Sequence, residues 1–528
     1  MNLKFRKNKL ILQLRKKWGV PELKEREISE ISKYFNNTQA EENNKYVLDD
    51  RTWNDLDMDA VFSQIDRTLT TPGDNLLYKL LFEPLLEEEI LEERSKIINM
   101  YLHNQELRER SQMILSKLGK ERGNYLVDML LGDRPPASKY AFVYSLILIL
   151  IPVFFVLGLL NYTFAWFGLG AAVIGNMILH YKTKERIYEH LSSIRYLGRL
   201  IRCGSQLIRI NHPVLKKHLD TLGRSLSHVS YIAKKTGLLG REGDFVLLEY
   251  LNIIFLIEVR AFHSVLRVLD RYENHLQKIF RTIGFIDAMI SVASYRAGLK
   301  HYIEPEFINT RPGLKIDEVI HPLIADPVPN SIEVESRGIL VTGSNMAGKT
   351  TFLKAIGVNA VLAQTINTCL AKKYQTCFFK IITLIGRADN VIEGKSYYLD
   401  ELQAMLRIIK SINSDVTCLC FLDEIFRGTN SLERSAASAE VLLYLARNNC
   451  IIFATTHEHE LIEIVSRAFM NYHFSEEIED DRGISFDYQL LEGPSTHHNA
   501  IKLLRHVGYP DEITEAADRR MSGKRKGE

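Results

Sequence analysis

The sequence predicts an α/β nucleotide-binding domain in the C-terminal part of the chain, joined to a long all-α region that an apolar helical hairpin interrupts. Three observations lead to this prediction. Residues 338–363 read as a short apolar strand, a loop bounded by glycines and an apolar helix. Residues 46–135 and 183–305 show long helical patterns. Residues 140–181 contain no Asp, Glu, Lys or Arg.

The loop after the first strand has the G-x-x-x-x-G-K-[ST] spacing of a phosphate-binding loop, or P-loop. Its glycines let backbone N–H groups turn toward phosphate oxygens, and the following helix adds its positive dipole end. Lys349 can reach the β- and γ-phosphates, and the Thr350 hydroxyl can bind Mg²⁺. The spacing also occurs in unrelated loops, but the strand before it and the helix after it favour nucleotide binding. The predicted binding residues are Gly343, Ser344, Asn345, Met346, Ala347, Gly348, Lys349, Thr350 and Thr351.

Two later apolar runs end in side chains suited to the same chemistry. Residues 418–422 lead into Asp423 and Glu424. In P-loop ATPases one acid holds Mg²⁺ and another group positions the attacking water, although an acidic pair can also simply mark the end of a strand. Residues 450–455 lead to His457, which is either a sensor of the γ-phosphate or a structural histidine. The predicted catalytic residues are Lys349, Glu424 and His457, and the predicted Mg²⁺ ligands are Thr350 and Asp423.

Together, the segments GSNMAGKTTFLKAIG, FLDEIFRGTNSLERSAA and FATTHEHEL resemble the ATPase domain of the MutS family. The pair Asn345-Met346 and the triplet Arg427-Gly428-Thr429 distinguish that family from most P-loop ATPases. Residues 394–402 resemble its signature segment, which implies that Ser396 reaches the nucleotide of a partner subunit. Phe426 departs from the family, which usually has glycine there. The resemblance implies an ABC-like P-loop fold of the MutS type, ATP and Mg²⁺ as cofactors, ATP hydrolysis, and a homodimer formed through the ATPase domains.

Two helical segments resemble the lever of the same family, DAVFSQIDRTLTTPGDNLLYKLLFEPLLEEEIL and IGFIDAMISVASYRAGLKHYIEPEF. The resemblance covers most of residues 46–518 and does not include the family's mismatch-reading domain, so the sequence predicts a short form. The predicted organisation is a basic N-terminal arm (1–45), a first lever part (46–135), a transmembrane hairpin (140–181), a second lever part (183–305), the ATPase domain (306–518) and a basic tail (519–528).

The uncharged stretch has room for two membrane-spanning helices of about 20 residues each. We place them at about 140–159 and 164–179, with Asn161, Tyr162 and Thr163 in the turn. Basic residues flank the stretch on both sides, which predicts a multi-pass protein on the cytoplasmic face of a membrane. The alternative is a hairpin buried in a soluble helical core. A soluble core helix normally keeps a polar face, so we expect insertion.

Composition limits the remaining possibilities. The formal net charge of +2 over 528 residues does not by itself indicate nucleic-acid binding. The six cysteines show no metal-binding spacing, which predicts core thiols in a reducing compartment. The basic N-terminal segment could lie on an anionic membrane, contact nucleic acid, or form a solvated helical arm.

The sequence leaves three functions open. The first is a membrane-anchored, MutS-like ATPase that binds DNA in mismatch repair or related DNA processing. The second is a membrane-tethered scaffold in which ATP controls dimer opening and DNA is not read. The third is a role at ribosomes or in recombination, like that of the Smr-bearing MutS paralogues. The sequence does not decide between them, because the basic residues of the lever are scattered.

Overall fold

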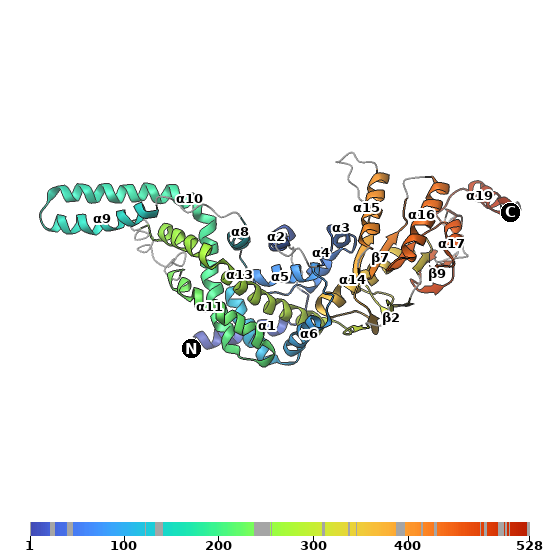
Figure 1. The fold of residues 1–528 in the computed structure, drawn as a ribbon, viewed down its shortest axis with the longest axis horizontal. Coiled ribbons are helices and arrows are strands. Elements are labelled where there is room, and N and C mark those ends of the chain that lie inside the picture. Colours follow the sequence, from blue (N-terminus) through green and yellow to red (C-terminus); the bar gives the residue numbers. More distant parts are fainter. Residues whose placement is uncertain are drawn as a thin grey trace. The chain divides into compact units, whose positions relative to one another are not determined.

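A computed structural model of the 528-residue chain contains two compact units (Figure 1). The first unit comprises Met1–Asn44, Gln64–Leu80 and Ser95–Gly298, and the second comprises Lys45–Ser63, Leu81–Arg94 and Leu299–Glu528. The structure describes all residues except 1, 22–26, 40–45, 122, 133–140, 237–253, 255, 309–311, 336–337, 345, 387–396, 413–414, 427–429, 476, 480–482, 495–500, 502–503, 506 and 525–528.

Helices make up the described part of the first unit. The longest are α10 (Thr163–Leu207) and α13 (Ile257–Gly298), and α13 has a kink at Tyr272, whose backbone is not helical. The other α-helices that the structure describes before residue 299 are α1 (Asn2–Lys17), α2 (Ile28–Gln39), α3 (Asp50–Asp55), α4 (Met58–Ile65), α5 (Thr71–Phe82), α6 (Glu88–His103), α7 (Gln105–Leu118), α8 (Tyr125–Leu131), α9 (Ala141–Leu159) and α11 (Lys216–Thr236). Short 3₁₀ turns at Ile208–Ile210 and Pro213–Leu215 join α10 to α11.

A buried carboxylate on α13 holds the loop that precedes α5. Asp287 has no exposed surface and accepts hydrogen bonds from the backbone N–H of Thr70 at 2.8 Å and from its hydroxyl at 2.6 Å. A Cβ on Gly73 would lie 2.2 Å from Asp287 Oδ2, so only glycine fits there. Burial raises the pKa of Asp287 to about 7 and that of the neighbouring Asp74, which pairs with Lys120 at 2.8 Å, to about 6.

These two carboxyl groups should make the helical unit less stable as the pH rises from about 4 to about 7. Their folded-state pKa values lie above the usual value near 4. Their contribution is therefore fully present below about pH 4 and is lost as the pH rises through about 6 and 7. Chemical denaturation at several pH values, followed by circular dichroism, measures this slope. Asp287→Asn should flatten it, and an equal slope in the variant and the wild type would contradict the assignment.

The uncharged stretch forms two antiparallel helices, α9 and the first part of α10 (Figure 1). They pack closely, because a Cβ on Gly158 would lie 2.8 Å from the Trp166 ring and one on Gly168 would lie 2.8 Å from the Phe154 ring. Asn161 makes the turn between the helices in a left-handed conformation, with φ of 68°.

The prediction of a transmembrane hairpin, and with it a location on the cytoplasmic face of a membrane, is wrong. Within the part of the chain that the structure describes, no helix combines the length and the apolar character needed to cross a bilayer. Residues 140–181 contain no charged side chain, but uncharged polar residues interrupt this stretch. Asn176, inside the expected second span, is 1% exposed and donates from Nδ2 to the carbonyl of Ile254 at 2.6 Å.

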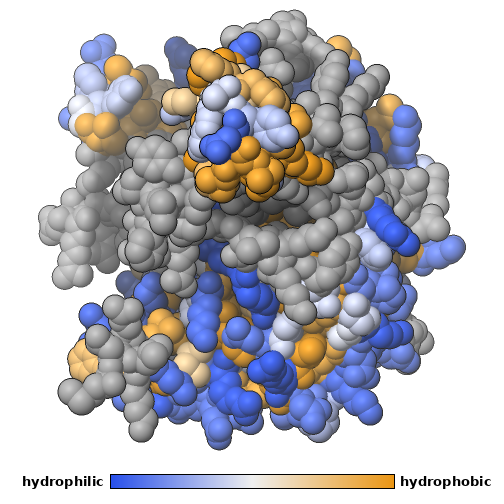
Figure 2. Space-filling model, turned by 90° about the vertical axis from the view of Figure 1, so that its left-hand side faces the viewer, coloured by the Kyte–Doolittle hydropathy of each residue, from blue (hydrophilic) through white to orange (hydrophobic). Residues whose placement is uncertain are grey.

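The hairpin nevertheless exposes apolar side chains. Phe167, Ile174 and Ile178 of α10 follow the i, i+7, i+11 spacing of one helix face and are 82%, 61% and 54% exposed. Figure 2 shows apolar atoms gathered at the end of the hairpin that faces the viewer. The apolar residues that made the sequence resemble a membrane segment are therefore present on the surface of the hairpin.

The second unit contains a six-stranded sheet in the order β12-β9-β4-β8-β7-β6, in which β12 alone pairs antiparallel with its neighbour. Its strands are β4 (Gly338–Thr342), β6 (Lys380–Leu384), β7 (Cys418–Asp423), β8 (Cys450–Thr455), β9 (Phe469–Phe474) and β12 (Leu490–Glu492). A four-stranded sheet has the order β1-β5-β2-β3 and consists of β1 (Glu306–Phe307), β2 (Leu314–Val319), β3 (Asn330–Val334) and β5 (Lys373–Thr376). The hairpin of β10 (Glu477–Glu479) and β11 (Gly483–Ser485) forms a third, two-stranded sheet.

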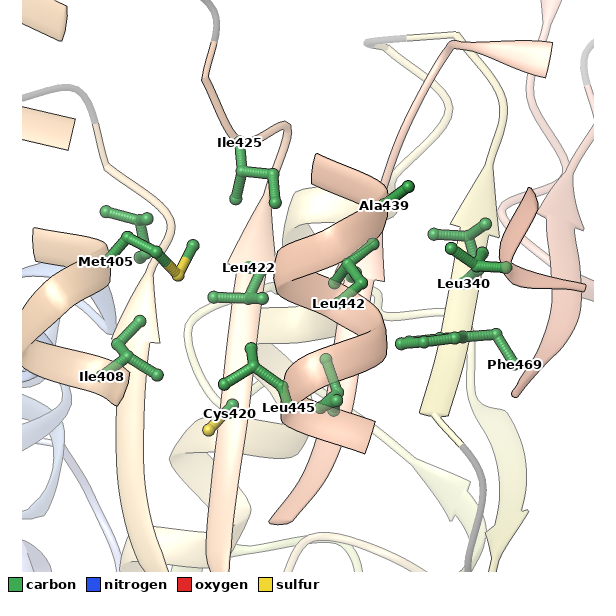
Figure 3. Close-up of a cluster of buried hydrophobic side chains, with 14 of the residues drawn as sticks. Leu340, Met405, Ile408, Cys420, Leu422, Ile425, Ala439, Leu442, Leu445 and Phe469 are labelled. Atoms are coloured by element: carbon green, nitrogen blue, oxygen red, sulfur yellow. The ribbon is translucent and has the colours of Figure 1, made fainter. Parts of the chain in front are cut away.

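Helices cover the large sheet and bury its apolar residues. In Figure 3, Met405 and Ile408 of α15 (Tyr397–Ser411) lie beside Leu422 of β7. Leu442 and Leu445 of α16 (Ser431–Ala446) belong to the same cluster. Further helices of this part, among the residues that the structure describes, are α14 (Lys349–Ile366), α17 (His459–Val465) and α19 (Asp511–Lys524). The predicted helical and α/β parts of the fold are thereby confirmed.

All six cysteines are free thiols, and five of them are buried. Burial raises the pKa of Cys203 to about 12 and also raises that of Cys377. The pKa of Cys420 is raised by its hydrogen bond to Cys450 and by burial. These are packed core thiols, as their positions within apolar runs predict.

Candidate nucleotide-binding site

The P-loop connects the central strand β4 to the start of α14. Gly343 and Gly348 have φ values of 130° and 101°, a region that residues with a side chain rarely adopt. A Cβ on Gly343 would also lie 2.8 Å from the carbonyl oxygen of Phe474. Both glycines are therefore required for the turn that brings the chain from the strand to the helix N-terminus, where backbone N–H groups can bind an anion.

Lys349, Glu424 and His457 meet at the carboxyl ends of neighbouring parallel strands. The Lys349 side chain is 2% exposed, and its Nζ donates to the carbonyl of Gly343 at 2.5 Å. The same Nζ lies 3.0 Å from His457 Nε2 and 3.6 Å from Glu424 Oε1. His457 Nε2 also contacts the Glu424 carboxylate. The structure thus brings together the three side chains that the sequence predicts as catalytic, although Glu424 and His457 both lie more than 70 residues after Lys349 in the chain.

Thr350 and Asp423 lie together beside this group. Thr350 Oγ1 donates to Asp423 Oδ2 at 3.0 Å. Hydroxyl and carboxylate oxygens are the ligand type that Mg²⁺ prefers, with phosphates and water completing its coordination. Among the described residues, no group of three or more His, Cys, Asp or Glu side chains is arranged to hold a metal ion. The pair therefore fits a cation that arrives together with a phosphate.

Thr455 is part of this arrangement and was not predicted. Its hydroxyl donates to Asp423 Oδ1 at 2.5 Å and accepts a hydrogen bond from the backbone N–H of Glu424 at 3.1 Å. One side chain at the end of β8 thus orients both members of the acidic pair at the end of β7. The sequence signal is a hydroxyl residue at the end of the strand that leads to His457.

The loop after β7 has an unusual backbone. Glu424 and Phe426 have φ values of 50° and 62°, in the left-handed region that costs residues with a Cβ about 1–2 kcal/mol. Phe426 is only 3% exposed, and its ring meets that of Tyr398 edge-on at 6.4 Å. Phe426 therefore keeps a conformation that glycine would adopt readily, and the burial of its ring offsets the strain.

A cavity of about 440 Å³ adjoins the P-loop. Its lining includes Met346, Thr351, His321, Asn330 and Tyr488. Burial, and then the charge of Lys354, lowers the pKa of His321 to about 4, so its imidazole is neutral at physiological pH. Asn330 fixes one wall, because its Nδ2 donates to the carbonyl of Tyr488 at 3.0 Å and its Oδ1 accepts from the N–H of Leu490 at 2.7 Å. The size and mixed polarity suit a nucleoside.

Some predicted site residues lie outside the described part of the chain. Asn345 of the P-loop and Ser396 of the signature segment belong to this group, and residues 427–429, which carry part of the family resemblance, also lie outside the described residues. Met346 is described and is 68% exposed at the mouth of the cavity. The roles predicted for Asn345 and Ser396 remain predictions.

The part of the chain that carries this site is similar to known proteins. Residues 339–523 match the family model described as MutS domain V. The chain is 28% identical over 274 residues to the DNA mismatch repair protein MutS of Streptococcus pyogenes serotype M49 (strain NZ131), an alignment that covers 50% of this chain and 32% of that protein. It is 27% identical over 274 residues to the protein of the same name from serotype M5 (strain Manfredo). The alignment spans about a third of the length of these curated relatives.

Proposed function

We propose, from the match of residues 339–523 to MutS domain V, that the second unit binds and hydrolyses ATP with Mg²⁺ and that this reaction serves a DNA-binding protein of the MutS type. The comparisons support this function at a coarse level, as a mismatch-repair-related DNA-binding ATPase. The observation that supports the chemistry best is the meeting of Lys349, Asp423, Glu424 and His457 around a glycine-bounded loop.

Binding would use the P-loop and the adjoining cavity. The triphosphate lies against the backbone N–H groups of the loop, and the nucleoside occupies the 440 Å³ cavity. Lys349 exchanges its contact with the carbonyl of Gly343 for the β- and γ-phosphate oxygens. Thr350 and Asp423 would hold Mg²⁺, which would neutralise charge on the phosphates.

Hydrolysis would use the two side chains that contact Lys349. Glu424 accepts a hydrogen bond from the attacking water and takes its proton as the new bond to the γ-phosphorus forms and the bond to the ADP oxygen breaks. His457 donates a hydrogen bond to the γ-phosphate. Thr455 keeps the carboxylate of Asp423 and the backbone of Glu424 in place. Two chains pair through these units, and Ser396 completes the site of the partner subunit.

DNA binding is the part of this function that a direct measurement should test first. Purified protein is incubated with homoduplex, mismatched and branched DNA, with and without ATP, at two salt concentrations. We expect binding that ATP changes and that weakens steeply with salt, because counterions are released from the phosphates. The Lys349→Ala variant is the control and should lose the response to ATP. No binding to any of these DNAs, under conditions where the wild type hydrolyses ATP, would contradict the DNA-binding part of the proposal.

A further inference from the structure

Residues 46–57, which we call the clamp segment, belong to the second unit although they lie far from the P-loop in sequence. The segment contains α3, whose N-cap Asp49 accepts a hydrogen bond from the N–H of Thr52 at 2.9 Å. The Trp53 ring stacks on Phe82 with ring centroids 3.6 Å apart. Figure 1 shows α3 in the same part of the molecule as α14 and α15. The clamp segment is thus a folded element, held within the unit that carries the P-loop.

The clamp segment fixes the P-loop helix on one side. Lys354 Nζ of α14 donates to Asp57 Oδ2 at 2.5 Å. Leu56 is completely buried and covers Gly357, where a Cβ would lie 2.7 Å from Leu56 Cδ2. Since α14 begins with Lys349, these contacts set the position of the helix that supplies Lys349 and Thr350.

The clamp segment also fixes the carboxyl end of β6. Asp55 is 7% exposed, and its Oδ2 accepts hydrogen bonds from Thr383 Oγ1 at 2.7 Å and from the N–H of Ile385 at 2.9 Å. Its Oδ1 accepts from the N–H of Gly386 at 3.0 Å. A Cβ on Gly386 would lie 2.6 Å from that oxygen, so the backbone approaches the carboxylate as closely as glycine permits.

The same segment holds α15 from its first turn to its third. Arg51 Nη1 donates to Asp400 Oδ2 at 3.1 Å, and Arg407 pairs with Asp49. Arg407 Nη2 also donates to the carbonyl of Thr383 at 2.6 Å, which ties α15 to β6. From α15, Tyr398 reaches the ring of Phe426 in the loop that carries Glu424. The contacts therefore run from the clamp segment through α15 to the acidic pair.

We propose that the clamp segment is a positioning element that sets Glu424 relative to Lys349, with Asp55 as its central residue. This inference rests on the proposed ATPase function. Asp55 touches none of the residues that we assign to the nucleotide, so it acts through β6, α15 and Phe426. A displacement of about 1 Å in such a site can cost on the order of 100-fold in rate. The chain runs from the clamp segment through α4 into the first unit.

The first test is Asp55→Asn, which keeps the size of the side chain but replaces one acceptor oxygen with an amino group. That group would face a backbone N–H of Ile385 or Gly386. We expect the kcat for ATP hydrolysis to fall at least tenfold, while the Kd for a fluorescent ATP analogue stays within threefold of the wild type and unfolding remains cooperative. A kcat within twofold of the wild type would overturn the inference. An equal loss of binding and turnover with non-cooperative unfolding would also overturn it, because the role would then be purely structural.

The second test exchanges the charges of one contact. Arg51→Asp and Asp400→Arg should each lower kcat several-fold, and the double variant should recover to within twofold of the wild type. The matched control reverses the pair formed by Glu318 of β2 and Lys372, which directly precedes β5, with Nζ and Oε1 2.8 Å apart, and should leave kcat unchanged in each single variant. Failure of the double variant to recover would overturn the inference. A wild-type protein that does not hydrolyse ATP would instead contradict the proposed function, so the two failures can be told apart.

Discussion

Replacing Glu424 with glutamine should slow ATP hydrolysis by about 10²- to 10⁴-fold while ATP still binds. That range is the usual contribution of a positioned general base. Glutamine keeps the shape of the side chain but cannot take the proton of the attacking water. It also removes a negative charge 3.6 Å from Lys349 Nζ, which should favour the triphosphate over the empty site. Single-turnover hydrolysis and equilibrium binding of a fluorescent ATP analogue measure the two effects separately.

The neighbouring carboxylate of Glu458 supplies the control for this experiment. Glu458 pairs with Arg434 and accepts a hydrogen bond from Ser435 at 2.5 Å, so it is engaged with α16 and not with Lys349. Glu458→Gln should hydrolyse ATP at close to the wild-type rate. Unchanged turnover in Glu424→Gln would remove that residue from the mechanism, and a loss of ATP binding would assign it a structural role.

Replacing Lys349 with alanine should raise the Kd for ATP by at least about 100-fold. The ammonium group is buried and would make two charge-assisted hydrogen bonds to the β- and γ-phosphate oxygens. Each bond of that kind contributes about 1.5–3 kcal/mol, and 1.4 kcal/mol corresponds to a factor of ten. The variant also leaves the carboxylate of Glu424 without the cation that lies beside it. Isothermal titration calorimetry with ATP and Mg²⁺ measures this loss.

Lys315→Ala is the matched control, because Lys315 forms an exposed pair with Glu333 at 2.6 Å on the four-stranded sheet. Its ATP affinity should equal that of the wild type. If Lys349→Ala retained ATP affinity within tenfold, the phosphates would have to bind elsewhere, and the P-loop assignment would fail.

The site could be located from the sequence because its chemistry depends on local patterns. A strand, a glycine-bounded loop and a helix identify Lys349 and Thr350, and two further strands end in Asp423 and His457. The carboxyl ends of parallel strands meet at one edge of a sheet, and the structure shows these side chains together there. Thr455 was missed because a single hydroxyl residue at a strand end carries no distinctive pattern.

The contacts of the clamp segment could not be predicted in this way. Asp55 meets Gly386 across a separation of 331 residues, and no periodicity in either segment encodes that pairing. The left-handed conformation of Phe426 was equally hidden, because an aromatic residue at that position argues against such a turn. The prediction of a transmembrane hairpin was wrong for a different reason. The transmembrane prediction considered only the absence of charged residues. It did not consider uncharged polar residues such as Asn176, which donates a hydrogen bond to the carbonyl of Ile254.

The burial of the native thiols makes the chain suitable for site-specific labelling. A maleimide reacts with exposed thiolates, and five of the six cysteines are buried, with the pKa of Cys203 raised to about 12. Cys450 is the half-buried exception, and Cys450→Ser would remove it. A new cysteine at an exposed helical position, such as Ser227 of α11, would then be the main site of fluorophore attachment. Its signal could follow the helical unit in real time as nucleotide binds to the other unit.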